Sequence, residues 1–189
     1  MKILLTFLAL LICFQSSTIA DDISDFEIEG MSIGDSALNF FEKSSIVKNT
    51  WDYPGSNKYK RAQNDNMSFF EVYDAVDFMY ETNDKKYLIQ SLAGIFLTKD
   101  MEQCIKKQNS IVSDLEIAFP NAEKTERDKI YNDNQWQGSR NRQITFWLDT
   151  GIASVHCNDY SEKHGGQDHL AVNLRTNKSN DFLTNEAYK

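Results

Sequence analysis

The amino-acid sequence predicts an α+β domain, with an antiparallel sheet of about five strands and two helices packed on one face. Residues 69–80 alternate between apolar and polar side chains, which is typical of a half-buried strand. Apolar residues recur at helical spacing from Met101 to Phe119. Short turn signals separate further apolar segments near the end of the chain. The order is helix, hairpin, helix, and then a hairpin with one more strand, which suggests two halves, 30–97 and 98–177.

The chain begins with a segment typical of a secretory signal peptide. Lys2 precedes an apolar run over residues 3–14, and small or polar residues lead to Ala20. This run is too short to span a bilayer core of roughly 30 Å. We therefore expect cleavage after Ala20, a mature domain over 21–189, a periplasmic or secreted location, and no stable insertion into the membrane.

The segment after this leader predicts one helix and then a connection. Ser32 and Asp35 have the spacing of a capping box, so a helix should begin after Ser32. Residues 44–66 are polar and contain Pro54-Gly55, a dipeptide that favours a turn. We expect an extended or irregular connection there.

A hairpin and a second helix come next. The alternating strand 69–80 is followed by a polar turn and by residues 87–97, which are apolar on both faces and therefore belong in the centre of a sheet. Asp100 and Gln103 have the spacing to cap a helix that runs to about residue 118 and ends before Pro120.

The last third of the chain predicts a long surface loop and three strands. Residues 121–142 form the most polar stretch, rich first in charged side chains and then in Asn and Gln, which favours a loop. The chain after Asn177 is polar, and we expect a frayed tail. Three strand candidates are separated by short turns, and they cover residues 143–148, 152–160 and 169–175.

Acidic residues dominate the charge of the chain. It contains 20 Lys and Arg against 28 Asp and Glu, a net charge of −8, and loss of Lys2 with the leader makes the mature chain more negative still. Such a surface repels the phosphate backbone of nucleic acids. The basic clusters at 58–61 and 140–142 are short and isolated. We therefore expect no nucleic acid partner.

Two cysteines remain once the leader is removed. Cys13 lies within the leader, and the bulky Ile12 before it argues against lipid attachment. Cys104 and Cys157 form an obvious pair in an oxidising compartment, with two buried free thiols as the alternative. Their disulfide would close a loop of about 54 residues and stabilise the fold by roughly 4 kcal/mol. It would also place the second helix beside the strand that carries Cys157.

Residues 26–38, which begin FEIEGMSIGDS, resemble the start of a group of small exported proteins from marine alphaproteobacteria. The resemblance covers this segment and the leader. It implies a periplasmic or secreted setting and no mechanism.

Two short motifs invite an enzymatic interpretation. Ser36 lies in a Gly-Asp-Ser-Ala-Leu segment like that of the GDSL-type esterases, whose nucleophilic serine takes its base from a later Asp-x-x-His motif. No histidine of this chain has an aspartate three positions before it, so a helix N-terminus explains Ser36 better. Asp149-Thr150-Gly151 resembles the tripeptide of aspartic proteases. Only 38 residues follow it, and a hairpin turn explains it without catalysis.

The three histidines, His156, His164 and His169, are the candidates for a metal site. If the strands that flank the Gly165-Gly166 turn form a hairpin, His156 and His169 should lie opposite each other. Neutral imidazoles there could bind Zn²⁺ or Cu²⁺. Their spacing matches no established site, so histidines on the rim of a hairpin are the simpler interpretation.

Aromatic side chains are the main candidates for binding. Trp51, Tyr53, Tyr131 and Trp136 fall in the predicted loops, where exposed rings could bind a glycan or a peptide. Rings that cover sheet edges are the alternative. We expect an exported, non-catalytic protein that binds a protein, peptide or glycan, or helps to maintain the cell envelope, without a cofactor. The rival hypothesis is a hydrolase that uses Ser36 or a histidine-bound metal.

Overall fold

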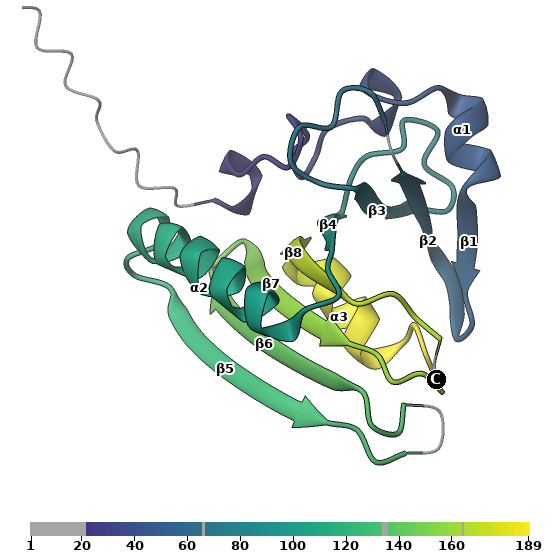
Figure 1. Cartoon of the computed structure of the whole chain (residues 1–189). Helices are drawn as coiled ribbons and strands as arrows, with labels where there is room; N and C mark the ends of the chain where they lie inside the picture. The colour runs from purple at the N-terminus through teal and green to yellow at the C-terminus, as the bar shows by residue number, and fades with distance from the viewer. Residues whose placement is uncertain (1–21, 66, 134–135, 164) are drawn as a thin grey trace, which may run out of the picture.

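The computed structural model describes residues 22–65, 67–133, 136–163 and 165–189. The eight strands of this part of the chain form one antiparallel sheet, in the order β1-β2-β3-β4-β8-β7-β6-β5 (Figure 1). The α+β class and the antiparallel sheet are confirmed, whereas the prediction of about five strands is wrong. The strands are β1 Thr50–Tyr53, β2 Ser56–Asp65, β3 Ala75–Glu81, β4 Ser91–Leu97, β5 Glu123–Ile130, β6 Arg140–Trp147, β7 Gly151–Asp159 and β8 His169–Thr176.

Two four-stranded meanders meet at the centre of the sheet. Strands β1 to β4 form one meander and β5 to β8 the other, and β4 pairs with β8 along its whole length. Helix α1, Lys43–Lys48, precedes the first meander, and helix α2, Met101–Ala118, precedes the second. Each meander lies within one of the halves 30–97 and 98–177. A duplication of the two halves stays a prediction.

Helices α1 and α2 cover the same face of the sheet, which we call the outer face. Ile46 of α1 and Leu115 of α2 share one apolar core with alternate strand residues such as Phe78 and Leu174. Removal of these large side chains from water is the main force that holds the helices on the sheet. The core of the domain therefore lies between the outer face and these two helices.

Helix α2 begins and ends where the sequence predicts. The Asp100 carboxylate accepts hydrogen bonds from the backbone N–H groups of Glu102 and Gln103, at 2.9 and 3.3 Å. The helix ends at Ala118, and its C-cap residue Phe119 stands directly before Pro120, which cannot continue a helix. Local signals alone were enough to predict this element.

The predicted cysteine pair joins α2 to the centre of the sheet. The Sγ atoms of Cys104 and Cys157 lie 2.04 Å apart, at disulfide distance. Along the same helix, the buried Gln108 amide donates to the carbonyl oxygens of Val155 and Arg142, at 2.7 and 3.0 Å. A covalent link and two buried hydrogen bonds therefore fix α2 across β6 and β7.

The helix predicted after Ser32 is wrong. A 3₁₀ helix at Ala37–Asn39 and then α1 take its place. The Asp35 carboxylate accepts a hydrogen bond from the N–H of Ser32 at 2.9 Å, but this bond closes a turn. The N–H of Gly34 donates to the carbonyl of Ile89, and the N–H of Ile89 donates to the carbonyl of Asp35. The backbone groups that a helix would use are therefore bonded to a distant segment.

Both strands of the first predicted hairpin are shorter than expected. Strand β3 begins at Ala75 rather than at residue 69. The carboxylate of Glu29 accepts the N–H groups of residues 71–73, each at 2.8 Å, and holds that backbone outside the sheet. Strand β4 begins at Ser91, because the residues before it bond to the turn that precedes the 3₁₀ helix.

Residues 44–66, predicted to be irregular, contain most of α1 and the hairpin of β1 and β2. The Pro54-Gly55 dipeptide lies in the turn of this hairpin, as expected. Only Tyr59, Ala62 and Asn64 are buried along β2, and its other side chains are at least partly exposed. With so few apolar anchors, β2 has no alternation that identifies it as a strand.

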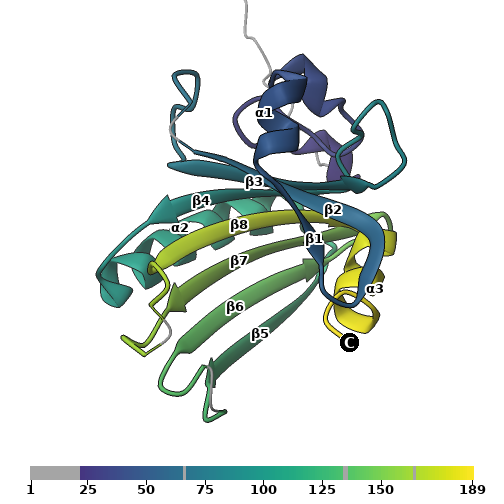
Figure 2. The same ribbon diagram turned by 90° about the vertical axis from the view of Figure 1, so that its right-hand side faces the viewer.

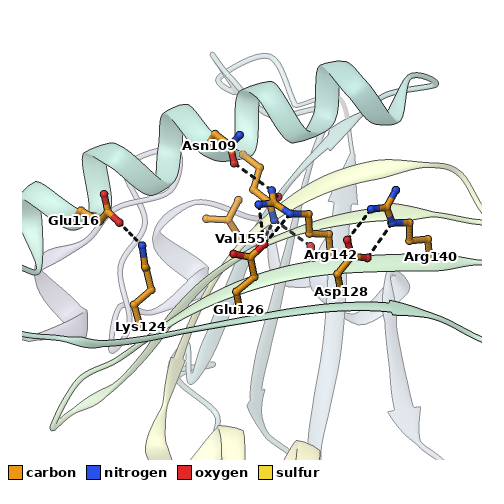
Figure 3. A network of polar contacts seen from close by, with 9 residues as sticks. Asn109, Glu116, Lys124, Glu126, Asp128, Arg140, Arg142 and Val155 are labelled. Atoms are coloured by element: carbon orange, nitrogen blue, oxygen red, sulfur yellow. Dashed lines mark hydrogen bonds and ion pairs between the residues drawn. The ribbon is translucent and has the colours of Figure 1, made fainter.

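Strand β5 contradicts the long loop predicted over residues 121–142. All its residues are exposed, so no apolar pattern reveals it. Paired charges take the place of apolar contacts along this edge of the sheet. Its ion pairs on the outer side join Lys124 to Glu116 of α2, Glu126 to Arg142 and Asp128 to Arg140 (Figure 3).

The chain after Asn177 forms helix α3, Asn177–Asn185, where a frayed tail was predicted. Phe182 of α3 is fully buried, with its ring centroid 4.7 Å from that of Tyr59 and 5.2 Å from that of Tyr53. These tyrosines point away from the outer face, so α3 packs on the opposite face from α1 and α2. Two helices on one face were predicted, as α1 and α2 are, but the third helix on the opposite face was not. One apolar residue in a polar segment was too weak a signal for this helix.

The leader, residues 1–20, lies outside the described residues, so the signal peptide stays a prediction. Among the residues that the structure describes, no helix is both long enough and apolar enough to cross a bilayer.

Candidate functional site

The inner face of the sheet, opposite α1 and α2, has a floor of small and polar side chains. Ala93, Asn173, Ser154 and Thr145 lie side by side on the adjacent strands β4, β8, β7 and β6. The last three are at most 8% exposed, although none is large. In Figure 2, α2 lies behind these strands and α3 lies at one end of the sheet, beside the β1–β2 hairpin. The floor of the inner face is thus small and polar, whereas the outer face is apolar.

The sheet curves enough to bring its two ends toward each other over this floor. In a flat sheet, β2 and β7 would lie about 19 Å apart, which is four strand spacings. Burial raises the pKa of Tyr160, which follows β7, and the charge of Arg61 on β2 acts against that rise. Burial lowers the pKa of His169, and Arg61 lowers it further. The charge of Arg61 therefore acts on residues from the far side of the sheet.

One wall of the concave face carries a buried ion pair. The guanidinium of Arg61 contacts the carboxylate of Asp77 through both Nε and Nη2, and Asp77 is 6% exposed. Burial alone would lower the pKa of Arg61, but the charge and hydrogen bonds of Asp77 outweigh burial and raise it. The Arg61 guanidinium also lies 5.1 Å from the centre of the Trp51 ring, a cation–π distance. Both guanidinium contacts are made to Oδ2 of Asp77.

A second guanidinium on the same face has no such partner. Among the described residues, the side chain of Arg175 makes no ion pair or hydrogen bond, and its Nε is buried. Burial lowers the pKa of Arg175, and the nearby Tyr53 and Asp77 only partly offset this effect. Arg175 itself is partly exposed, so its Nε is one buried donor on the inner face without a partner among the described residues.

His156 is held neutral at the floor. Burial, together with the charge of Arg175, lowers its pKa to about 3. Its Nε2 lies 2.9 Å from the hydroxyl of Ser154. An imidazole with this pKa stays uncharged at any physiological pH, so it contributes a polar contact and no charge to the floor.

A chain of three side chains runs across the other end of the face. The Asn141 amide donates to Oδ1 of Asn158 at 2.8 Å, and the Asn158 amide lies 3.0 Å from Nε2 of His169. Nδ1 of His169 lies 2.9 Å from the carbonyl of Gln167, so Nδ1 carries the proton and Nε2 accepts. The chain ends at Oδ1 of Asn141, an acceptor without a hydrogen bond among the described residues.

An aromatic pocket surrounds the Asn141 end of this chain. Ring centroids are 6.2 Å apart for Tyr131 and Trp136, and 5.9 Å apart for Trp136 and Tyr160. These rings border a cavity of about 290 Å³. The pocket thus combines apolar ring faces with amide groups. Its lining consists of Tyr131, Trp136, Ser139, Arg140, Asn141, Asn158 and Tyr160.

The structure separates the four aromatic residues that the sequence singles out. Tyr131 and Trp136 lie together in the aromatic pocket. Trp51 and Tyr53 belong to β1, at the opposite edge of the sheet, and not to a loop. Trp51 is 42% exposed, whereas Tyr53 is buried against Phe182. The first two therefore border this pocket, and Tyr53 belongs to a small core under α3.

The histidines are not arranged as predicted. His156 lies opposite Ala171, and His169 lies opposite Asn158, so the two histidines do not face each other across the hairpin. The loop is longer than a tight turn, which shifts the register. His164 lies outside the described residues. No group of three His, Cys, Asp or Glu side chains within the described part of the chain has a geometry suited to a metal ion.

The two catalytic motifs occupy structural positions. The hydroxyl of Ser36 lies 2.5 Å from the carbonyl of Lys86 and caps the 3₁₀ helix. Asp149 and Gly151 flank Thr150 in the turn between β6 and β7, and Thr150 Oγ1 accepts a hydrogen bond from the N–H of Ile23 at 3.0 Å. These contacts agree with the structural interpretation of both motifs.

Sequence analysis missed Arg61, Asp77, Arg175, Asn158 and Tyr160. Strand β8 carried a signal for a polar inner face, because every second residue of this strand is small or polar instead of large and apolar. Comparisons with protein-family models, with curated proteins and with solved structures found no match. Function is therefore inferred from the geometry of the inner face.

Proposed function

We propose that this protein is an exported, non-catalytic binding protein that holds a glycan in the aromatic pocket. The observation that carries this proposal is the shared cavity of Tyr131, Trp136 and Tyr160 with the open end of the asparagine chain. A sugar ring presents C–H faces, which pack against aromatic rings, and hydroxyl groups, which hydrogen-bond to amides.

The size and charge of the pocket favour a neutral sugar unit. Its volume of about 290 Å³ lies at the small end of ligand sites, which suits one end of a glycan better than a folded partner. The Arg140 guanidinium is already paired with Asp128, through hydrogen bonds of 2.9 and 2.6 Å. Neither Arg140 nor Asp128 therefore offers an unpaired charge to a ligand. Hydrogen bonds would determine which sugar the pocket selects.

Two features of the chain support a location outside the cytoplasm. The leader over residues 1–20 has the layout of a signal peptide. The Cys104 and Cys157 sulfurs lie at disulfide distance, and structural disulfides persist in oxidising compartments. A periplasmic or secreted protein would meet glycans of the cell surface or of its surroundings.

The proposal is tested by titration with maltotriose, cellotriose and triacetylchitotriose, followed by tryptophan fluorescence. At least one sugar should produce a saturable change, and Trp136→Ala should abolish it. Trp147→Ala is the matched control, because Trp147 is an exposed tryptophan on the same face outside the pocket. If none of the three sugars changes the fluorescence, or if Trp136→Ala responds like the wild type, the glycan proposal is wrong.

A further inference from the structure

The two edges of the sheet are built differently. Strand β1 is a protected edge, because it has only four residues, its register shifts between Asp52 and Tyr53, and Pro54 follows it. Strand β5 has eight residues, contains no proline, and pairs with β6 in unbroken register from Glu123 to Ile130. No strand of the described chain lies beyond β5, so one side of its backbone keeps unpaired N–H and carbonyl groups. The β5 edge can therefore accept a further strand.

The charges of β5 suit a strand with the same sequence. Residues 123–130 include three acidic and three basic side chains, so this strand is neutral although the whole chain has a net charge of −8. All its residues are exposed. Charged side chains on an edge often keep other strands away, but opposite charges that face each other across two strands attract. The order of the charges along β5 therefore decides which strand it accepts.

Two charged residues of β5 lack an ion pair within the described part of the chain. The ion pairs of β5 use Lys124, Glu126 and Asp128, and leave Glu123 and Arg127 without one. Glu123 and Arg127 alternate with the three residues that face α2 in Figure 3, so both lie on the inner face. They are four positions apart, about 13 Å along a strand, so they cannot pair with each other in one copy. A second strand in the right register would bring opposite charges to both.

We propose that β5 pairs antiparallel with β5 of a second copy of this chain, around a two-fold axis at Thr125. A residue on such an axis lies opposite its own copy, so a charged residue there would meet a like charge. Within residues 123–129, Thr125 alone is uncharged. An axis at Ile130, the last residue of the strand, would leave most of β5 unpaired. Two threonines that face each other across strands are also a favourable pair.

The register around Thr125 matches the charges on both faces. Glu123 lies opposite Arg127 of the second copy on the inner face, and Lys124 lies opposite Glu126 on the outer face. The two-fold axis repeats both pairs, and no like charges face each other between residues 123 and 127. Opposite Cα atoms in antiparallel strands are about 4.5 to 5.5 Å apart, so these side chains can interact. The two sheets join into one, and this interface does not depend on the glycan proposal.

Analytical ultracentrifugation of the whole mature chain tests the proposal. The wild type should form a dimer as its concentration rises, and high salt should weaken the dimer because the ion pairs are exposed. Arg127→Glu and Glu123→Arg should each raise the dissociation constant at least tenfold, because each variant puts like charges opposite each other. An equimolar mixture of the two variants should restore the dimer, since the facing residues again differ in sign. Lys129→Glu reverses a charge outside the paired segment and is the matched control, with a dissociation constant within about twofold of the wild type.

An added cysteine tests the register. Thr125→Cys should give a disulfide-linked dimer under mild oxidation, because the two added thiols face each other at the axis. Lys129→Cys is the matched control, because it is exposed on the same strand but its two copies would lie about 27 Å apart. The proposal is overturned if the wild type stays monomeric, if mixing the two charge variants restores nothing, or if Thr125→Cys links no faster than Lys129→Cys. Trp136→Ala should dimerise like the wild type, so failure of the glycan proposal leaves this result intact.

Discussion

Residues of the two faces of this sheet alternate along the same eight strands, yet the two faces have different roles. On the outer face, alternate residues are large and apolar, and they meet α1, α2 and the cysteine pair. On the inner face, the central floor is small and polar, and the face also carries two arginines, a neutral histidine and a chain of amides. One strand can serve both purposes because its side chains alternate between the two faces.

The comparison shows where stability and function reside. Burial of apolar surface favours folding whichever ligand is present, so the outer face carries most of the stability. Unsatisfied polar groups cost free energy in the absence of a ligand, and such groups gather at sites of function. Among the described residues, the inner face has the unpaired Nε of Arg175 and an open acceptor on Asn141, whereas α2 is satisfied at both its cap and its buried glutamine.

The largest expected difference between the faces concerns core packing. Phe78→Ala on the outer face removes a fully buried ring that stacks on Phe41 and should cost about 3 to 5 kcal/mol of unfolding free energy. Asn173→Ala on the inner face should cost less than about 1 kcal/mol, because its amide makes only one long hydrogen bond, 3.4 Å, to Ala171. Urea unfolding of both variants provides the measurement. Equal losses of unfolding free energy would contradict the conclusion that the outer face carries most of the stability.

The cysteine pair tests the attachment of α2 to the outer face. Replacing both Cys104 and Cys157 by serine should lower the unfolding free energy by roughly 4 kcal/mol, because the unfolded chain regains the freedom of a loop of about 54 residues. Reduction of the wild type before urea unfolding should give a similar loss. If the wild type and the double variant unfold at the same urea concentration without reductant, the pair does not form a disulfide in solution.

The inner face should carry a pH dependence through His156. The pKa of His156 is about 3 in the folded protein and about 6.5 in the unfolded chain, so its stabilisation is complete above pH 6.5 and is lost as the pH falls toward 3. In that window, His156→Gln should remove up to about 1.4 kcal/mol per pH unit from the slope of unfolding free energy against pH. Urea unfolding at several pH values measures it. An unchanged slope would show that His156 has the same pKa in the folded protein as in the unfolded chain.

The smallest expected effect lies in the ion pairs of β5. Lys124→Ala removes the pair with Glu116 of α2, and both side chains are nearly half exposed. Such a pair should contribute less than about 1 kcal/mol and should weaken in salt. A double-mutant cycle with Glu116→Ala, measured at low and high salt, isolates this interaction. A larger coupling that persists in salt would mean that the β5 edge is held far more firmly than an exposed ion pair allows.

The sequence predicted elements whose signals are local. Helix α2 was identified with its cap and its end, because Asp100, the helical spacing and Pro120 act within a few residues. Strands β6, β7 and β8 were placed to within a few residues, because apolar runs between turns mark buried strands. The cysteine pair also followed from the sequence, since two cysteines in an exported chain leave little choice of partner.

Only the tertiary structure decided the remaining elements and the candidate site. Strand β5 depends on charges that meet across strands, and the turn at Gly34 depends on bonds to Ile89, which no local pattern contains. The register of β7 against β8 separated His156 from His169, and the curvature of the sheet brought Arg61 toward Tyr160. Composition and periodicity determine which residues are buried and in which element. Which polar groups meet across a curved sheet depends on register and curvature, and both are set by contacts between distant parts of the chain.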